Sequence, residues 1–143
     1  MSTAEMTSPE PPKPRPRWRI PVAIVALLFG AATIKSGGSV LFIDGPDRVA
    51  AGDYVPFVLW FNFLAGFFYI AAGIGIFMWK SCVAKLAALI ASLSIAVFIA
   101  LGVHILMGGA FEMRTVYAMT LRCFVWLTFA FLLMRATHPE PAT

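Results

Sequence analysis

The chain has 143 residues, of which 60% are hydrophobic and 13% are charged, whereas an ordinary soluble domain is about half apolar and about a quarter charged. This composition excludes an ordinary soluble fold and predicts that lipid surrounds most of the chain. The net charge of +4 accompanies no nucleic-acid-binding motif, and two cysteines, Cys82 and Cys123, are too few for a disulfide framework or a zinc site.

The first 19 residues are rich in proline and nearly free of aliphatic side chains, so they cannot bury enough apolar surface to offset the entropy of ordering. We expect residues 1–19 to form a disordered cytoplasmic arm. A signal peptide over residues 1–32 is the competing interpretation, because Gly30-Ala31-Ala32 offers small residues for cleavage. The long proline-rich lead and the lysine that follows the apolar run argue against it.

Four apolar segments approach the roughly 20 residues that a helix needs to cross a hydrocarbon core about 30 Å thick. They are apolar on both faces, whereas the strands of a membrane barrel alternate apolar and polar residues. The segments are Ile20–Ile34, Val55–Trp79, Val83–Met107 and Thr115–Met134. Since their connections are short, the sequence predicts an all-α integral membrane protein, an antiparallel four-transmembrane-helix bundle over residues 20–135 with a short cytoplasmic tail at 136–143.

The end of the first span is ambiguous. Ile20–Ile34 would be about 22 Å long as a helix, and an extension to Ile43 would be about 36 Å long. Either the span ends near Lys35, whose amine then reaches outward while Val40–Ile43 lies along the interface, or it continues through a kink at Gly37-Gly38. The first alternative is favoured, because adjacent glycines and serines are weak helix formers.

Lysine and arginine are unevenly divided between the two membrane sides, and the cytoplasmic side carries the excess. One set of flanks and connections holds Lys13, Arg15, Arg17, Arg19, Lys80, Lys85 and Arg135. The other set holds Lys35, Arg48 and Arg114. Both termini are therefore expected inside, with the connections 35–54 and 108–114 outside and a turn at Asp44–Asp47.

Small residues form stripes along three spans, and helices in lipid associate through such stripes. The second span has Asn62, Gly66, Tyr69 and Gly73 on one face, the first repeats the spacing with Ala26, Gly30, Thr33 and Gly37, and the third has Ala87, Ala91 and Ser94. We predict helix packing through Ala26, Gly30, Gly66 and Gly73. Packing alone explains these small residues without a ligand.

Polar side chains within the spans gather toward the outer half, so a ligand site is expected to open outward. The candidate ligand-binding residues are Lys35, Asn62, Tyr69, His104 and Arg122. Arg122 is the most informative, because a guanidinium at the centre of a span costs about 2.5–3.5 kcal/mol on insertion scales. In a structural role, Arg122 snorkels or pairs with Glu112 or an acid of the first loop. In a functional role, it anchors an anionic or carbonyl-bearing ligand by forked hydrogen bonds.

The remaining candidates have structural alternatives as well. The Tyr69 hydroxyl bonds to Asn62, Thr33 or a ligand carbonyl, or Tyr69 only packs. His104 is a proton carrier, a metal ligand or a satisfied interfacial histidine. A haem between helices needs a second membrane histidine, and His138 lies beyond the fourth span on the opposite side. No catalytic constellation and no metal-binding cluster is recognisable.

Several stretches resemble the DoxX-like family of small four-span bacterial membrane proteins. They are "LLFGAATIK" (Leu27–Lys35), "LAGFFYIAAGIGIF" (Leu64–Phe77), "KSCVAK" (Lys80–Lys85) and "LGVH" (Leu101–His104). The family takes its name from a subunit linked to thiosulfate-to-quinone electron transfer. The resemblance implies a bacterial inner-membrane location, an association with membrane redox partners or quinone, and Lys35 and His104 as the positions nearest to the family pattern. Relatives often carry an acid in the second span, where this sequence has Asn62 and Tyr69.

Three functional hypotheses follow. The first is a non-catalytic accessory subunit of a membrane redox system, whose outward polar pocket binds a quinone, a lipid or a partner. The alternative is an oligomeric transporter of a small molecule or ion, formed from several copies of the chain. An enzyme acting through His104 and Arg122 ranks last, because only Glu112 offers a second acid or base nearby.

Overall fold

The computed structural model describes residue 11 and residues 14–137, and all regular structure in that part of the chain is helical. The helices are α1 (Arg19–Phe42), α2 (Pro46–Ala50), α3 (Pro56–Phe77), α4 (Val83–Leu106) and α5 (Met113–Thr137). Most of the predicted N-terminal arm, at 1–10 and 12–13, and the tail from His138 lie outside the described residues.

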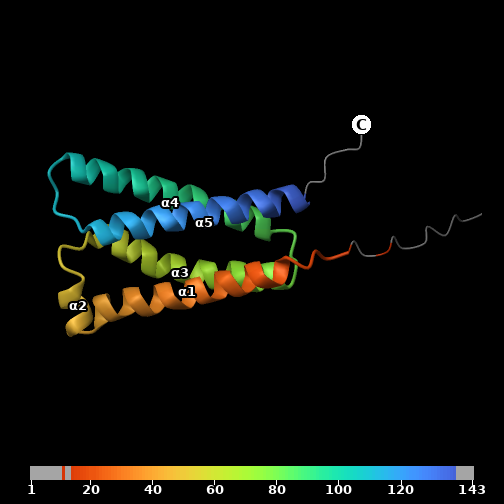
Figure 1. Cartoon of the computed structure of the whole chain (residues 1–143), viewed down its shortest axis with the longest axis horizontal. Helices are drawn as coiled ribbons and strands as arrows, with labels where there is room; N and C mark the ends of the chain where they lie inside the picture. Colours follow the sequence, from red (N-terminus) through yellow and green to blue (C-terminus); the bar gives the residue numbers. More distant parts are fainter. Residues whose placement is uncertain (1–10, 12–13, 138–143) are drawn as a thin grey trace, which may run out of the picture.

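Four of the helices, α1, α3, α4 and α5, are long and apolar enough to cross a membrane. Their 22 to 25 residues correspond to about 33–38 Å of helix, enough for a hydrocarbon core of about 30 Å. They run antiparallel in sequence order (Figure 1), so that the start of α1 and the end of α5 share one end of the bundle, the terminal end. We call the opposite end of the bundle, where α2 lies, the α2 end. The predicted four-helix membrane bundle is confirmed.

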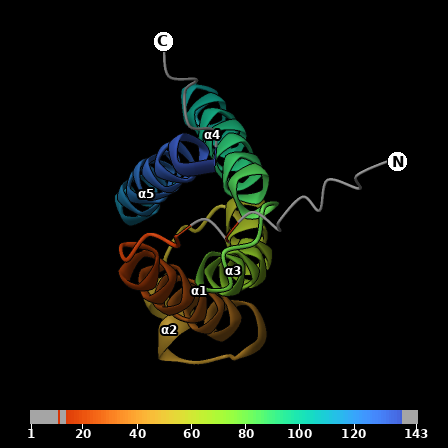
Figure 2. The same cartoon turned by 90° about the vertical axis from the view of Figure 1, so that its right-hand side faces the viewer.

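The bundle consists of two closely packed helix pairs. α1 packs most extensively on α3, and α4 on α5, while α3 and α4 connect the pairs. Seen along the bundle, α5 lies on the same side as α1 (Figure 2), but the backbones of these two helices approach each other much less closely than those within a pair. Along the seam between α1 and α5, these helices therefore meet through side chains, as in the contact of Arg122 with Thr33.

Glycines set the close approach of α1 to α3. A Cβ added to Gly66 would lie 2.6 Å from Ile34 Cγ1 and 3.1 Å from the Gly30 carbonyl oxygen. A Cβ added to Gly30 would lie 2.9 Å from the Gly66 carbonyl oxygen. Further along, Gly73 packs against Leu27 and the backbone of Ala23. Any side chain at the Gly30–Gly66 contact would push the helices apart.

The first span does not end near Lys35, so the favoured interpretation of that segment is wrong. α1 continues as helix through Gly37 and Gly38 to Phe42. A Cβ at Gly37 would lie 3.1 Å from Phe63 Cβ of α3, so this glycine serves helix contact. Within lipid the backbone must satisfy its own hydrogen bonds, and this requirement outweighs the weak helix propensity of glycine. The Lys35 side chain is exposed on the helix surface.

Arg48 of α2 caps the end of α1. Its Nε donates to the Val40 carbonyl oxygen at 2.8 Å, and its Nη2 donates to the Leu41 carbonyl oxygen at 2.8 Å. Its Nη1 forms an ion pair with Asp44. The last carbonyls of a helix have no hydrogen-bond donor within it. Arg48 supplies donors to two of these carbonyls at the end of α1. The expected turn at Asp44–Asp47 is partly helical, because α2 begins at Pro46.

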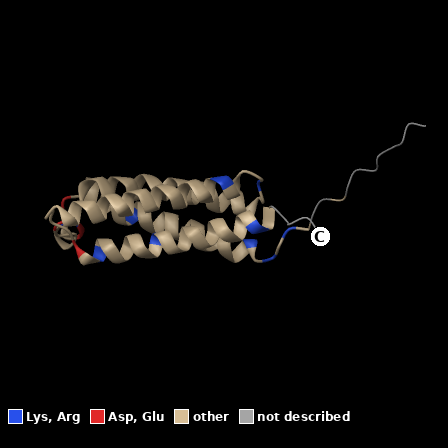
Figure 3. Cartoon of the chain, turned by 90° about the horizontal axis from the view of Figure 1, so that it is seen from above, with Lys and Arg blue, Asp and Glu red and all other residues tan. Residues whose placement is uncertain are grey.

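The packed core fills the terminal half of the bundle. Trp126, Leu133, Tyr69 and Ile76 are fully buried there among small alanines of α1, α3 and α4. A second, smaller cluster of Val55, Val58, Leu101 and Met119 joins α3, α4 and α5 near the α2 end. The described acids gather at the α2 end (Figure 3); they are Asp44, Asp47, Asp53 and Glu112.

Gly66→Leu is expected to lower the thermal unfolding temperature of the detergent-solubilised protein, because overpacking the contact with Gly30 costs about 1–3 kcal/mol. Circular dichroism during heating measures this. Gly102→Leu in α4 is the matched control, since a Cβ at Gly102 meets nothing within 4 Å. Equal losses for the two variants would contradict the assigned glycine contact.

Arg48→Met is expected to fray the last turn of α1 while leaving the rest of the bundle intact. Loss of two hydrogen bonds to carbonyls should lower the free energy of local opening by about 1 kcal/mol or more per bond. Amide hydrogen exchange at residues 38–43 should therefore become faster. Exchange followed by mass spectrometry reads this segment directly. Unchanged exchange there would remove the capping role, and Arg135→Met at the terminal end serves as the control.

Candidate functional site

A cavity of about 410 Å³ lies at the α2 end between α1, α2, α3 and α5, a volume in the range of small-molecule sites. It is open to the surface, because several lining side chains are exposed, including Ala32, Ser36 and Ala118. Its polar lining comprises Lys35, Ser36, Ser39, Asp47, Tyr54, Asn62, Glu112, Arg114 and Thr115. The apolar part of the lining includes Ala32, Leu59 and Ala118.

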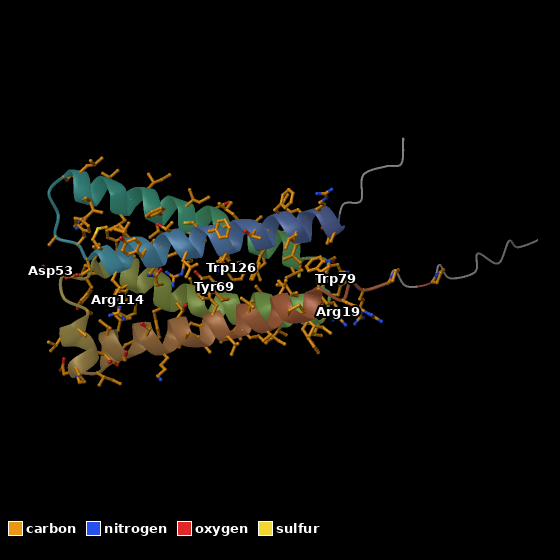
Figure 4. All side chains as sticks on the ribbon, in the orientation of Figure 1. Arg19, Asp53, Tyr69, Trp79, Arg114 and Trp126 are labelled. Carbon is orange, nitrogen blue, oxygen red and sulfur yellow. The ribbon has the colours of Figure 1, made fainter. Side chains whose placement is uncertain are left out.

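The cavity mouth carries charges of both signs, from Lys35, Arg114, Asp47 and Glu112. The Glu112 carboxylate accepts a hydrogen bond from the Asp53 backbone N–H at 3.1 Å. This bond ties the segment before α3 to the segment before α5, at the end where Figure 4 labels Asp53 and Arg114. Among the residues described, the one ion pair found is Arg48 with Asp44, outside this mouth. The lysine and arginine of the mouth are therefore available to a bound anion.

Arg122 lies one helical turn beyond the cavity floor. Ala118 of α5 lines the cavity, and Arg122 follows it four residues later, about 6 Å further along the helix. Thr33 of α1 is adjacent to the lining residue Ala32 and lies at the level of the cavity, because α1 runs toward the α2 end. Measured from Met113, Arg122 is about 14 Å from the start of α5. The guanidinium is thus inside the membrane-spanning part of the bundle.

The Arg122 side chain is 94% buried, with a relative exposure of only 6%. Its Nη2 donates to Thr33 Oγ1 at 3.4 Å, which is long for a hydrogen bond to oxygen. Its Nη1 lies 3.5 Å from the Met119 sulfur, which is a weak acceptor. The guanidinium carbon lies 5.6 Å from the Phe29 ring centroid and 5.8 Å from that of Tyr69. The structure shows no pairing with Glu112 or with any other acid of the described residues.

Aromatic rings wall this region. Tyr69 stacks on Phe29 with centroids 5.6 Å apart, and Trp126 lies against Tyr69 at 4.7 Å. Figure 4 shows Tyr69 and Trp126 midway along the bundle, between the two helix pairs. Cation–π contacts compensate part of a buried charge, but they place no anion beside it.

Five buried polar side-chain atoms inside the bundle have no hydrogen-bond partner among the residues that the structure describes. They are Asn62 Oδ1, the Tyr69 hydroxyl, Ser94 Oγ, Arg122 Nε and Trp126 Nε1. The Tyr69 hydroxyl lies near Ser94 and Arg122 without a hydrogen bond of normal geometry to either. Buried polar groups in proteins are nearly always bonded, so this concentration marks a site that another molecule can complete.

The structure brings four of the five predicted ligand-binding residues into one region. Lys35 and Asn62 line the cavity, and Tyr69 and Arg122 lie beneath it. His104 is elsewhere. Its Nε2 lies 3.0 Å from the Ala110 carbonyl oxygen, and its ring packs edge-on against Phe57. His104 thereby holds the connection between α4 and α5.

Sequence reasoning did not name Thr33, Ser94 or Trp126 as site residues. A sequence feature could have pointed to each of them. Thr33 and Ser94 lie on small-residue stripes, and Trp126 lies one turn from Arg122 on the same helix face. Within the described residues, no group of three His, Cys, Asp or Glu side chains is placed to hold a metal ion. Cys82 is exposed and Cys123 is buried, and both are free thiols.

Comparisons of the chain with protein-family models, with curated proteins and with solved structures find no match. The class therefore follows from the fold alone. The chain is a multi-pass membrane protein built as an antiparallel four-helix bundle.

His104→Ala is expected to loosen the connection after α4 without changing the retention of any molecule bound in the α2-end cavity. Loss of the contact with Ala110 should cost about 1 kcal/mol locally and accelerate amide exchange at residues 107–112. Gly109→Ala should act alike, because its Cβ would collide with the imidazole ring. Loss of a bound ligand in His104→Ala would instead assign the histidine to the ligand site.

Proposed function

We propose that the protein is a non-catalytic accessory subunit of the bacterial inner membrane that holds the polar head of a membrane amphiphile, a quinone or a lipid, in its α2-end cavity. The observation that carries this proposal is the open cavity of about 410 Å³ with both charge signs at its mouth. A polar head interacts with these side chains while its apolar tail stays in the bilayer.

The position of the cavity supports an amphiphile over a fully soluble ligand. Two small exposed residues on facing helices, Ala32 of α1 and Ala118 of α5, form part of its lining. They lie on the loosely packed seam between these helices. An apolar tail would leave the cavity along this seam and enter lipid, where its transfer from water is worth about 0.8 kcal/mol per CH₂.

The charge distribution supports an outward orientation of the cavity. The described basic residues Arg15, Arg17, Arg19, Lys80, Lys85 and Arg135 belong to the terminal end, whereas the acids gather at the α2 end. By the excess of positive charge in the cytoplasm, both termini lie inside and the cavity faces out.

The redox part of the proposal depends on the resemblance to DoxX-like proteins and remains a prediction. A quinone or a redox partner is its expected ligand. Transport through oligomers is the competing function. The terminal half of a single bundle is filled by packed apolar side chains, which argues against a path through one copy.

The test is purification in a mild detergent followed by native mass spectrometry and extraction of bound quinone and lipid. We expect a stoichiometric amphiphile on the parent protein and at least a fivefold loss in Ala118→Phe, whose ring would occupy part of the cavity. Ala100→Phe, at an exposed alanine of α4 outside the cavity, is the control. A parent protein without quinone, lipid or partner, or one that supports flux in liposomes, would overturn the proposal.

A further inference from the structure

We propose that Arg122, Tyr69, Ser94 and Trp126, named here the Arg122 cluster, bind the carboxylate of a single-chain amphiphile. This inference deepens the proposed function and rests on it, since it names the ligand class. The expected ligand is a fatty-acid-like molecule whose head enters through the α2-end cavity and places its carboxylate at Arg122, with its tail in the bilayer.

The charge of the site favours an anion. Arg122 is 94% buried within a membrane-spanning helix, and no carboxylate of the described residues pairs with it. An arginine stays protonated under all ordinary conditions. A neutral quinone carbonyl would accept a hydrogen bond but leave the positive charge uncompensated, whereas a carboxylate satisfies both requirements.

The unpartnered atoms of the cluster can all donate hydrogen bonds to an acceptor. Arg122 Nε and Trp126 Nε1 are donors only, and the Tyr69 and Ser94 hydroxyls can each donate; all four lack partners in the structure. Tyr69, Ser94 and Trp126 have no exposed surface. A carboxylate has about four acceptor positions and accepts a guanidinium in a forked arrangement.

The route to the cluster follows from the packing of the bundle. Arg122 lies one turn beneath the cavity floor at Ala118, and its Nη2 reaches across the loose α1–α5 seam to Thr33. Asn62 joins the two regions, because it lines the cavity and has an unpartnered oxygen. An amphiphile that arrives from the bilayer through this seam meets Arg122 before the aromatic pair of Tyr69 and Trp126.

The binding experiment uses the full chain in phosphatidylcholine nanodiscs with Trp18, Trp60 and Trp79 replaced by phenylalanine. The fluorescence of the remaining Trp126 then reports on the cluster. We expect a saturable change with dodecanoate, at an affinity at least tenfold higher than that for dodecanol. Chloride at constant ionic strength should not compete. Equal affinity for the acid and the alcohol, or full competition by chloride, would overturn the carboxylate assignment.

Variants separate binding from folding. Arg122→Gln is expected to weaken dodecanoate at least tenfold, whereas Arg135→Gln, an exposed arginine of the same helix, should bind like the parent. Ser94→Ala should weaken binding several-fold and yet leave the ligand-free unfolding temperature unchanged or higher, because it removes an unsatisfied buried hydroxyl. Parent-like dodecanoate affinity in Arg122→Gln would show that the cluster is only structural, and parent-like affinity in Ser94→Ala would remove Ser94 from the binding site.

The two proposals fail in different ways. If a bound amphiphile is retained by the parent and lost in Ala118→Phe, but binding is insensitive to Arg122→Gln, the cavity function stands and the cluster assignment is wrong. If no amphiphile is retained on purification and yet dodecanoate binds in an Arg122-dependent manner, the carboxylate site stands and the accessory role falls.

Discussion

The close contact between α1 and α3 is the constraint from which the rest of the structure follows. In lipid there is no hydrophobic force between helices, so association depends on how closely backbones approach. The Gly30–Gly66 contact commits the small-residue faces of both helices to each other. α5 packs on α4 instead, and it meets α1 across a seam of side chains. The cavity at the α2 end and the buried Arg122 both lie along this seam.

The burial of Arg122 along this seam is energetically costly. A guanidinium in the middle of a span carries an insertion cost, and here it has two weak hydrogen bonds and two aromatic rings but no counterion among the described residues. The neighbouring Tyr69, Ser94 and Trp126 also lack partners. A folded protein tolerates such groups when they serve a site. The packed core below them keeps that site closed toward the terminal end.

The ends of the bundle show where sequence reasoning was limited. Glycine and serine around Gly37 suggested that the first helix ends near Lys35, because intrinsic propensity was the available guide. The contact with Phe63 of α3 and the cap from Arg48 decided otherwise. Phe63 is remote in sequence from this segment, and Arg48 lies in a separate short helix. No local sequence pattern therefore predicts either contact.

The sequence by itself determined the membrane class, the four spans and the gathering of polar side chains toward one end, because hydropathy and backbone hydrogen bonding in lipid leave few alternatives. It also singled out Arg122, since a charge within an apolar run needs no structure to be noticed. Only the tertiary structure decided which polar groups meet. Four helices can rotate about their axes without changing their composition, and the packing of small residues fixes the rotation that places Ser94 and Trp126 beside Tyr69 and leaves His104 apart.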